Sequence, residues 1–233
     1  MTSESSTRRS RPEPWDPDRA VAAVALVALV PVLAAVALVV RACLGPPVLF
    51  RQVRAGRHGK PFTILKFRTM QMADSRCCEN PAACIGLQMP PGVTTPGLIG
   101  LVRRLGLDEL PQLVNIARGD MRFVGPRPLM PRYVGRYTPA QARRLEVLPG
   151  ITGWAQVSGR TDLPWEDRLD LDAWYVDRRS ARLDLRIALL TLRAALGGRG
   201  YSQSGSSTGY EFLGTGVAPG VCPARETGLG GLR

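Results

Sequence analysis

Residues 107–115 read L-D-E-L-P-Q-L-V-N and place two adjacent carboxylates, Asp108 and Glu109, ahead of a proline and a short amphipathic run. Asp108 is a good helix N-cap, and Pro111 is tolerated only in the first turn of a helix. A helix that ends near Gly119 is predicted by the apolar stripe of Leu110, Leu113, Val114 and Ala117.

This placement puts the two carboxylates at a helix N-terminus. The unpaired N–H groups and the macrodipole of such an end keep a carboxylate ionised and also attract phosphate. A phosphate substrate could therefore meet an anionic nucleophile, provided that a cation screens their repulsion. The alternative is purely structural, with Asp108 as a cap and Glu109 as an ordinary first-turn acid.

The charge balance of the chain indicates an acidic partner. The 233 residues suffice for one domain with appendages, and they carry a net charge of +12 with a pI near 10.5. Nucleic acid, an anionic membrane face and phosphorylated substrates would all satisfy this charge. A nucleic-acid binder would need aromatic residues interleaved with the basic ones, and the basic segments here have few, so we expect no nucleic-acid partner.

Cysteine and histidine offer little for catalysis. The five cysteines are an odd number, and Cys77, Cys78 and Cys84 do not follow a zinc-binding spacing, so we expect reduced thiols. The single histidine, His58, lies in a polar, glycine-containing turn. An active site in this chain must therefore use carboxylates and arginines.

The two ends differ from the middle in composition. Residues 1–19 are polar and rich in proline, and residues 197–233 are rich in Gly, Ser and Thr, so both predict disorder. Residues 20–44 predict a membrane anchor, because their apolar run of Ala, Val and Leu is long enough to cross about 30 Å of hydrocarbon. Pro31 interrupts this run, and the anchor could either span with a kink or enter and leave on one face.

The orientation of the anchor follows from its flanks. The segment before the anchor is neutral. The segment after it is basic and carries no acid before Asp74, which predicts a cytosolic position for the rest of the chain. The basic residues are Arg41, Arg51, Arg54, Arg57, Lys60, Lys66 and Arg68.

Several basic side chains stand at positions where an anion could bind. Residues 48–53 and 62–67 predict two strands, with Lys66 and Arg68 on one face, although this could be a solvated face. Arg103 precedes the two carboxylates, and Arg127 is held extended between two prolines. Residues 71–97 predict a loop.

The remaining segments predict mainly helices. Residues 138–147 predict a short helix, residues 148–160 a turn, a short strand and a second turn, and residues 166–179 an amphipathic helix. Residues 183–196 alternate leucines with arginines and are too short to span a membrane. They predict either a helix in the lipid headgroup layer or a buried core helix.

Six motifs in this order resemble the bacterial sugar transferase family, the small monotopic polyprenyl-phosphate sugar-1-phosphate transferases, also called phosphoglycosyl transferases. They are G-P-P-V-L-F-R-Q-x-R-x-G at 45–56, K-P-F-x-I-L-K-F-R-T-M at 60–70, L-D-E-L-P-Q-L-x-N at 107–115, G-D-M-R-F-V-G-P-R-P at 119–128, P-G-I-T-G-W-A-Q-V-S-G-R at 149–160 and W-E-D-R-L-x-L-D-x-W-Y-V at 165–176.

The resemblance implies a membrane enzyme that moves a sugar-1-phosphate from a UDP-sugar to undecaprenyl phosphate, with release of UMP. It makes Asp108 the nucleophile of a covalent phosphosugar intermediate and gives Glu109 a role in holding Mg²⁺ or in proton transfer, so that both carboxylates are candidate metal ligands. Candidate phosphate and substrate ligands are Lys66, Arg68, Arg103, Arg127, Gln156 and Arg160.

The implied architecture is an α/β catalytic domain over residues 45–196, mostly helical with few short strands and with interfacial helices. A re-entrant anchor broken at Pro31 would hold it on the cytoplasmic face of the cell membrane, at the first membrane step of exopolysaccharide, capsule or O-antigen assembly. Some residues depart from the family pattern, namely Val30, Leu105, Gly106 and Ser158. The alternative function is a catalytically silent scaffold that recruits downstream glycosyltransferases.

Overall fold

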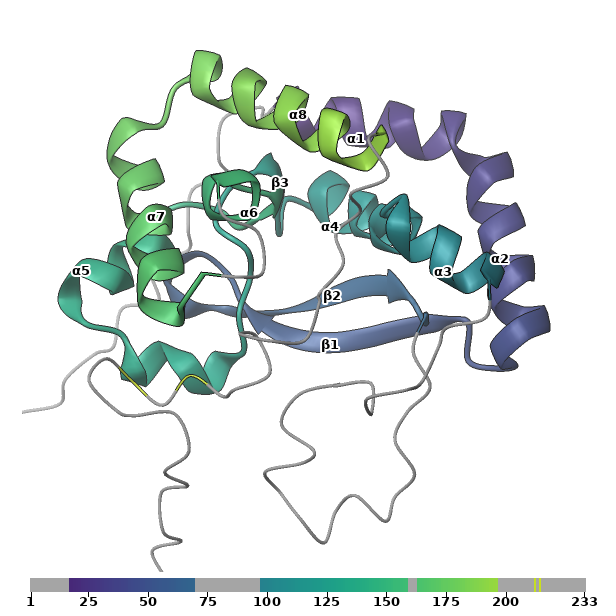
Figure 1. Cartoon of the computed structure of the whole chain (residues 1–233), viewed down its shortest axis with the longest axis horizontal. Helices are drawn as coiled ribbons and strands as arrows, with labels where there is room; N and C mark the ends of the chain where they lie inside the picture. Colours follow the sequence, from purple (N-terminus) through teal and green to yellow (C-terminus); the bar gives the residue numbers. More distant parts are fainter. Residues whose placement is uncertain (1–16, 70–96, 159–162, 197–211, 213, 215–233) are drawn as a thin grey trace, which may run out of the picture.

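The computed structural model describes residues 17–69, 97–158, 163–196, 212 and 214, and it begins with a pair of helices (Figure 1). These are α1 (Pro17–Ala28) and α2 (Val30–Leu44), which meet at Leu29 with a bend of 65°. Pro31 lies in the first turn of α2, where its missing N–H costs nothing. The predicted break is confirmed, but it falls two residues before the proline, and the first helix starts three residues before position 20.

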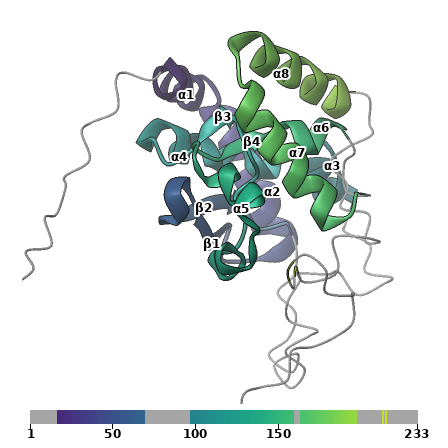
Figure 2. The same ribbon diagram turned by 90° about the vertical axis from the view of Figure 1, so that its left-hand side faces the viewer.

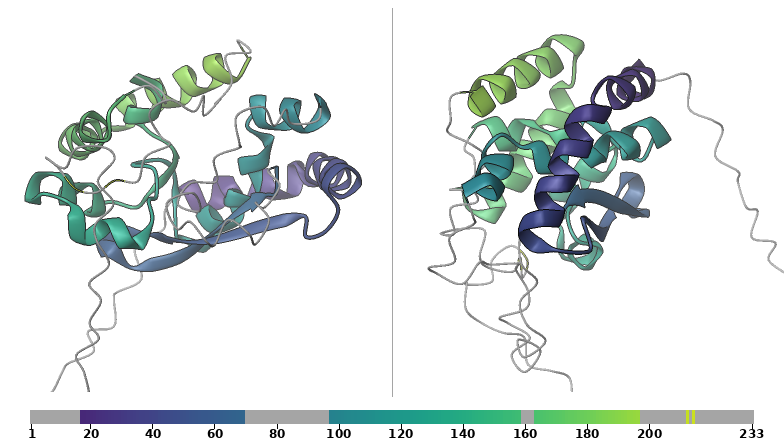
Figure 3. Two further views of the ribbon diagram at one scale, coloured as in Figure 1. Left: turned by 60° about the horizontal axis from the view of Figure 1, so that its bottom comes forward. Right: turned by 90° about the vertical axis from the view of Figure 1, so that its right-hand side faces the viewer.

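Both ends of this helix pair contact the rest of the chain. At the start of α1, Asp18 pairs with Arg122 at 2.9 Å, and the fully buried Ala22 packs in a core cluster with Ile64 and Ile116. At the end of α2, the carbonyl of Leu44 accepts a hydrogen bond from Arg68. Figure 3 shows the pair bending around one side of the molecule.

No single helix within the described residues is long and apolar enough to cross a membrane. The pair of α1 and α2 passes the same test only when its two members are taken together.

An antiparallel hairpin follows, as the sequence predicts. Strand β1 (Leu49–Ala55) pairs with β2 (Pro61–Phe67) in a register that places Leu49 opposite Phe67. The turn between them is a 3₁₀ segment, η1 (Arg57–Gly59), in which the exposed His58 has a φ of 56°. The predicted loop over 71–97, with its three cysteines, lies outside the described residues except for its last position.

The two carboxylates lie in a layer between this hairpin and α1 (Figure 1). The layer comprises α3 (Gly97–Arg104), the 3₁₀ helix η3 (Leu107–Gln112) and α4 (Leu113–Arg118). Leu113, Ile116 and Met121 form its buried core together with residues of α1 and β2.

A second sheet is parallel and has two strands. Strand β3 (Arg122–Val124) pairs with β4 (Gly150–Thr152), and their backbones approach closely at two glycines. A Cβ atom on Gly150 would lie 2.2 Å from the backbone nitrogen of Gly125, so no larger residue fits there. The predicted strand is confirmed, but the predicted second turn is wrong at its start, because α6 (Trp154–Ser158) follows directly.

The predicted helix over 138–147 is present in two parts, α5 (Pro139–Ala142) and η5 (Arg143–Leu145), and Thr138 caps it through a capping box with Gln141. Before it, η4 (Pro131–Arg136) packs on β1. Helix α7 (Trp165–Arg178) matches the predicted amphipathic helix to within one residue.

Helix α8 (Ala181–Leu196) packs against α6 on the outside of the molecule (Figure 2). Ile187 is fully buried, whereas Leu185, Leu189 and Leu192 are 55–62% exposed. A buried core helix is therefore excluded, since these leucines form an outward stripe. Of the predicted disordered tail, Phe212 and Gly214 are described, and Phe212 is buried against Tyr133 and Leu169, contrary to that prediction.

The described chain is thus mostly helical with two small sheets, which confirms the predicted α/β class in that broad sense.

Candidate active site

The two carboxylates lie in a 3₁₀ helix rather than at the cap of an α-helix. Gly106, with a φ of 69°, occupies the N-cap position of η3, and α4 begins only at Leu113 and ends before Gly119. The prediction that Asp108 caps the helix is therefore wrong. Its side chain is free to face the hairpin, since the backbone turn does not use it.

Asp108 is partly buried and accepts a hydrogen bond from a neutral side chain. The Thr69 hydroxyl donates a hydrogen bond of 3.3 Å to Asp108 Oδ2. Burial and the neighbouring charge of Glu109 raise the pKa of Asp108 to about 6, although the positive charges of Lys66 and Arg103 oppose them. The carboxylate is thus a stronger base than an ordinary aspartate, yet it is mostly ionised at pH 7.

Glu109 has the opposite environment. Its Oε1 accepts hydrogen bonds from Lys66 Nζ at 2.7 Å and from Arg127 Nη2 at 3.1 Å, and only 17% of the side chain is exposed. Burial alone would raise the pKa of Glu109, but the two cations outweigh it and hold that pKa at about 2. Burial also lowers the pKa of the Lys66 ammonium, against the pull of Glu109.

The structure therefore brings together five of the predicted site residues. Lys66 comes from β2, Asp108 and Glu109 from η3, and Arg127 from the segment after β3. Arg103, at the end of α3, lies close enough for its charge to lower the pKa of Asp108.

Two other predicted ligands are placed differently. Arg68 donates to the carbonyls of Leu44 and Gly45 and so joins the end of α2 to the hairpin. Gln156 donates to the carbonyl of Ile151 at 3.1 Å, and no hydrogen bond or ion pair joins it to Asp108 or Glu109 within the described part of the chain. Arg160 lies outside the described residues.

Sequence reasoning missed Asn115, which is fully buried and joins α4 to β2. Its Oδ1 accepts from the Leu65 N–H at 3.1 Å, and its Nδ2 donates to the Thr63 carbonyl at 2.7 Å. These bonds fix the strand that carries Lys66 relative to α4, which directly follows η3 and its Glu109.

Arg54 was also missed as a neighbour of the site. It lies on β1, and burial together with the charge of Arg127 lowers the pKa of its guanidinium to about 10. Its Nη1 donates to the carbonyl of Pro128 at 3.4 Å, so it supports the segment that carries Arg127.

The described residues offer two carboxylate ligands for the predicted Mg²⁺. No group of three acidic, cysteine or histidine side chains occurs within the described ranges, and Asp108 and Glu109 are the two carboxylates near the site. Mg²⁺ is often held by one or two carboxylates together with substrate phosphates, so this pair suits an ion that arrives with a diphosphate.

Comparison with known proteins gives consistent matches. A family model described as bacterial sugar transferase matches residues 17–198. The chain is 49% identical over 178 residues to the uncharacterised sugar transferase EpsL of Bacillus subtilis (strain 168), which covers 76% of this chain and 84% of that protein. It is 37% identical over 194 residues to the exopolysaccharide production protein ExoY of Rhizobium meliloti (strain 1021), covering 78% and 85%.

A longer relative carries a more specific name. The UDP-glucose:undecaprenyl-phosphate glucose-1-phosphate transferase of Escherichia coli (strain K12) is 37% identical over 183 residues, which cover 75% of this chain and 38% of that protein. The chain therefore spans less than half of this longer relative.

Proposed function

This chain belongs to the bacterial sugar transferase family, and from that premise we propose that it transfers a sugar-1-phosphate from a UDP-sugar to undecaprenyl phosphate and releases UMP. The relatives named as UDP-glucose:undecaprenyl-phosphate glucose-1-phosphate transferases support this donor and this acceptor. The relatives named as exopolysaccharide production proteins support the assembly of a polysaccharide as its setting.

The observation that carries the proposal is the unequal environment of two adjacent carboxylates. Glu109 is neutralised by Lys66 and Arg127, whereas Asp108 is partly buried with a raised pKa and accepts a hydrogen bond from a neutral hydroxyl. A more basic carboxylate is a better nucleophile, and the surrounding cations reduce its repulsion of a diphosphate.

In the proposed first step, an Asp108 carboxylate oxygen attacks the phosphorus atom that bears the sugar. A bond forms between Asp108 and that phosphorus while the bridging P–O bond breaks, and UMP leaves with the electron pair. In the second step, a phosphate oxygen of undecaprenyl phosphate attacks the same phosphorus, and the Asp108 carboxylate is regenerated. Neither step needs an external acid, since both leaving groups depart as anions.

The cations around Asp108 and Glu109 then have separate roles. Lys66 and Arg127 hold Glu109 ionised, and Arg127, which is 31% exposed, can also reach a substrate phosphate. Arg103 is close enough for its charge to act on Asp108, and it suits the lipid phosphate. Bound Mg²⁺, held by Asp108 and Glu109, would neutralise charge on the diphosphate.

We also propose that α1 and α2 form a re-entrant membrane anchor. Asp18 at the start of α1 pairs with Arg122, and the end of α2 accepts bonds from Arg68, so both ends of the pair contact one catalytic domain. A straight span would separate these ends by the thickness of a bilayer. The basic residues after the anchor support a position on the cytoplasmic face.

Exposed apolar side chains support the same membrane placement. They occur on α1, α2, α3 and α8, where a water-facing surface would normally be polar. The most exposed are Val21, Val24, Val27, Val30, Leu38, Leu98, Leu185, Leu189 and Leu192. Helix α8 also carries Arg182, Arg186 and Arg193, which suits a helix in the headgroup layer.

A labelling experiment tests the covalent step. Purified protein is mixed with Mg²⁺ and a UDP-sugar carrying a ³²P label in the sugar-linked phosphate, without any lipid acceptor. We expect acid-precipitated wild type to retain label that hydroxylamine removes, as an acyl phosphate would, and the Asp108→Asn variant to retain none. Equal labelling of both proteins would exclude Asp108 as the nucleophile.

A further inference from the structure

The segment that carries Arg127 is fixed along its whole backbone. Four successive carbonyls accept hydrogen bonds from three different parts of the fold. The donors are the Gly150 N–H to Pro126, Arg144 Nη2 to Arg127, Arg54 Nη1 to Pro128 and the Ala55 N–H to Leu129. Because Pro126 and Pro128 have no N–H of their own, these bonds are the segment's main restraint.

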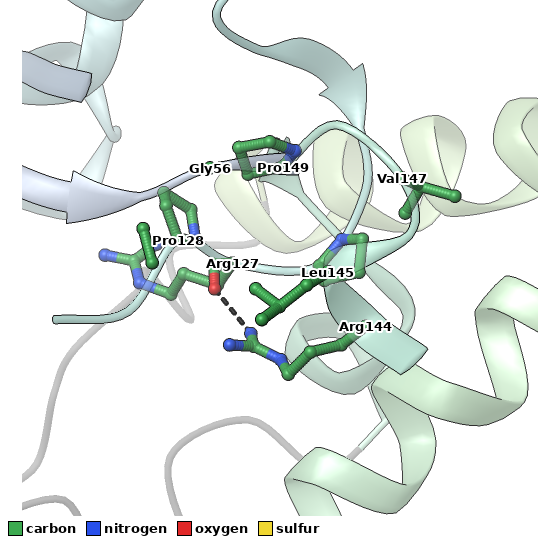
Figure 4. Close-up of a pocket in the computed structure, with 9 residues that line it drawn as sticks. Gly56, Arg127, Pro128, Arg144, Leu145, Val147 and Pro149 are labelled. Atoms are coloured by element: carbon green, nitrogen blue, oxygen red, sulfur yellow. Dashed lines mark hydrogen bonds between the residues drawn. The ribbon is translucent and has the colours of Figure 1, made fainter. Parts of the chain in front are cut away.

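The bond to Arg127 differs from the others because a buried ion pair supplies it. Arg144 Nη2 lies 2.6 Å from the carbonyl oxygen of Arg127 (Figure 4). The same nitrogen lies 2.8 Å from Asp172 Oδ2. Its Nε also donates to Asp172, and its Nη1 donates to the Tyr137 hydroxyl at 3.1 Å. Arg144 and Asp172 are 3% and 5% exposed, so neither reaches solvent or substrate.

We infer that Arg144, held by Asp172, is a positioning residue that acts on the reaction through Arg127. Its guanidinium joins α7 to the peptide carbonyl of Arg127, and the side chain of Arg127 contacts Glu109 at 3.1 Å. If that peptide group moves, the Arg127 guanidinium moves with it, away from both Glu109 and the substrate phosphate. This inference rests on the proposed function.

A neighbouring ion pair supplies a matched control. Arg143 and Asp177 also join η5 to α7, through two hydrogen bonds, but they are 44% and 39% exposed. Within the described residues, neither makes a hydrogen bond or ion pair with the segment that carries Arg127. A loss that comes only from weakening the contact between η5 and α7 would appear at both pairs.

The test is a double-mutant cycle. Arg144→Lys keeps the charge beside Asp172 but cannot donate to Asp172, Tyr137 and Arg127 together. We expect it to lower kcat/KM for UMP release about 10- to 100-fold, whereas Arg143→Lys stays within about twofold. In an Arg127→Gln background, Arg144→Lys should cost less than about twofold more, because residues that act through one another are not additive.

Hydrogen exchange gives a readout that does not depend on activity. The peptide that covers residues 125–130 should exchange faster in Arg144→Lys than in wild type or Arg143→Lys, even if the wild type releases no UMP and the proposed function fails. If Arg144→Lys does not fold, Asp172→Glu displaces the same guanidinium and takes its place in the cycle. Additive losses in the two backgrounds, or unchanged exchange, would overturn the inference.

Discussion

The Lys66 ammonium donates a 2.7 Å hydrogen bond to Glu109 Oε1 and not to the adjacent carboxylate of Asp108. Arg127, from the segment after β3, donates to the same oxygen. Asp108, one residue earlier, accepts instead from the neutral hydroxyl of Thr69. Two neighbours of nearly identical chemistry therefore differ in pKa in opposite directions, about 6 for Asp108 and about 2 for Glu109.

Neutralising the two carboxylates should change stability in opposite directions. The pKa of Asp108 is raised in the folded state, so ionising this carboxylate lowers the free energy of unfolding, and the full cost is present above about pH 6. Asp108→Asn should therefore stabilise the protein by about 1 to 2 kcal/mol at pH 7. Glu109→Gln should destabilise it by about 3 kcal/mol, because Lys66 and Arg127 lose their shared anion. Thermal unfolding in one detergent measures both.

The pH dependence of unfolding provides the control for this pair. Stability from Glu109 is present above pH 4.5 and is lost as pH falls towards about 2, whereas the cost of ionised Asp108 appears as pH rises from 3.8 through about 6. The advantage of Asp108→Asn should therefore vanish below pH 4. An advantage that is equal at pH 4 and pH 7 would contradict the assigned pKa of Asp108.

The rate of the first chemical step should have one acid limb, near pH 6. Asp108 must be ionised to attack, and its pKa is about 6, whereas Glu109 stays ionised throughout this range. Single-turnover UMP release between pH 4.5 and 8 measures this limb. A rate that is constant down to pH 4.5 would mean that Asp108 has an ordinary pKa.

Removing the charge of Lys66 should reduce catalysis and raise the pKa of Glu109. Lys66→Met retains the length of the side chain but leaves Glu109 with Arg127 alone, and we expect a loss in kcat of about 100-fold. Lys60→Met, at an exposed position on the same hairpin, should keep full activity. Equal effects at the two lysines would show that the general charge of the hairpin matters, rather than the contact with Glu109.

The anchor should expose both of its ends on one side of the membrane. In a variant without the other four cysteines, the exposed Cys43 reports the end of α2, and Pro17→Cys reports the start of α1. An impermeant maleimide should label both only in inverted vesicles. Labelling of the two positions from opposite sides would establish a span and would require the pair between Asp18 and Arg122 to be broken.

Local patterns predicted the parts of the fold that depend on local physics. The hairpin, the helix over α7 and the proline-linked break in the anchor follow from periodicity and turn residues. The cap at Asp108 was predicted wrongly, because Gly106 takes a left-handed conformation and starts a 3₁₀ helix earlier. The local sequence does not distinguish a 3₁₀ helix with Gly106 at its N-cap from an α-helix capped by Asp108.

The candidate site was only partly predictable for a different reason. The dyad and the basic residues could be identified, but the contacts of Glu109 with Lys66 and Arg127 cross 43 and 18 positions. Arg68 was grouped with Lys66 because they share a strand face, yet Arg68 lies past the end of β2 and bonds the end of α2. The role of Asn115 also depends on a strand 50 positions away.

The most direct test of the central claim is UMP release by the purified membrane protein supplied with UDP-sugars, undecaprenyl phosphate and Mg²⁺, comparing wild type with Asp108→Asn. The account predicts UMP with at least one sugar from the wild type, and none from a variant that is folded and at least as stable. UMP release by Asp108→Asn at the wild-type rate would contradict it. A wild type that releases none, while a related enzyme works in the same assay, would favour a silent scaffold instead.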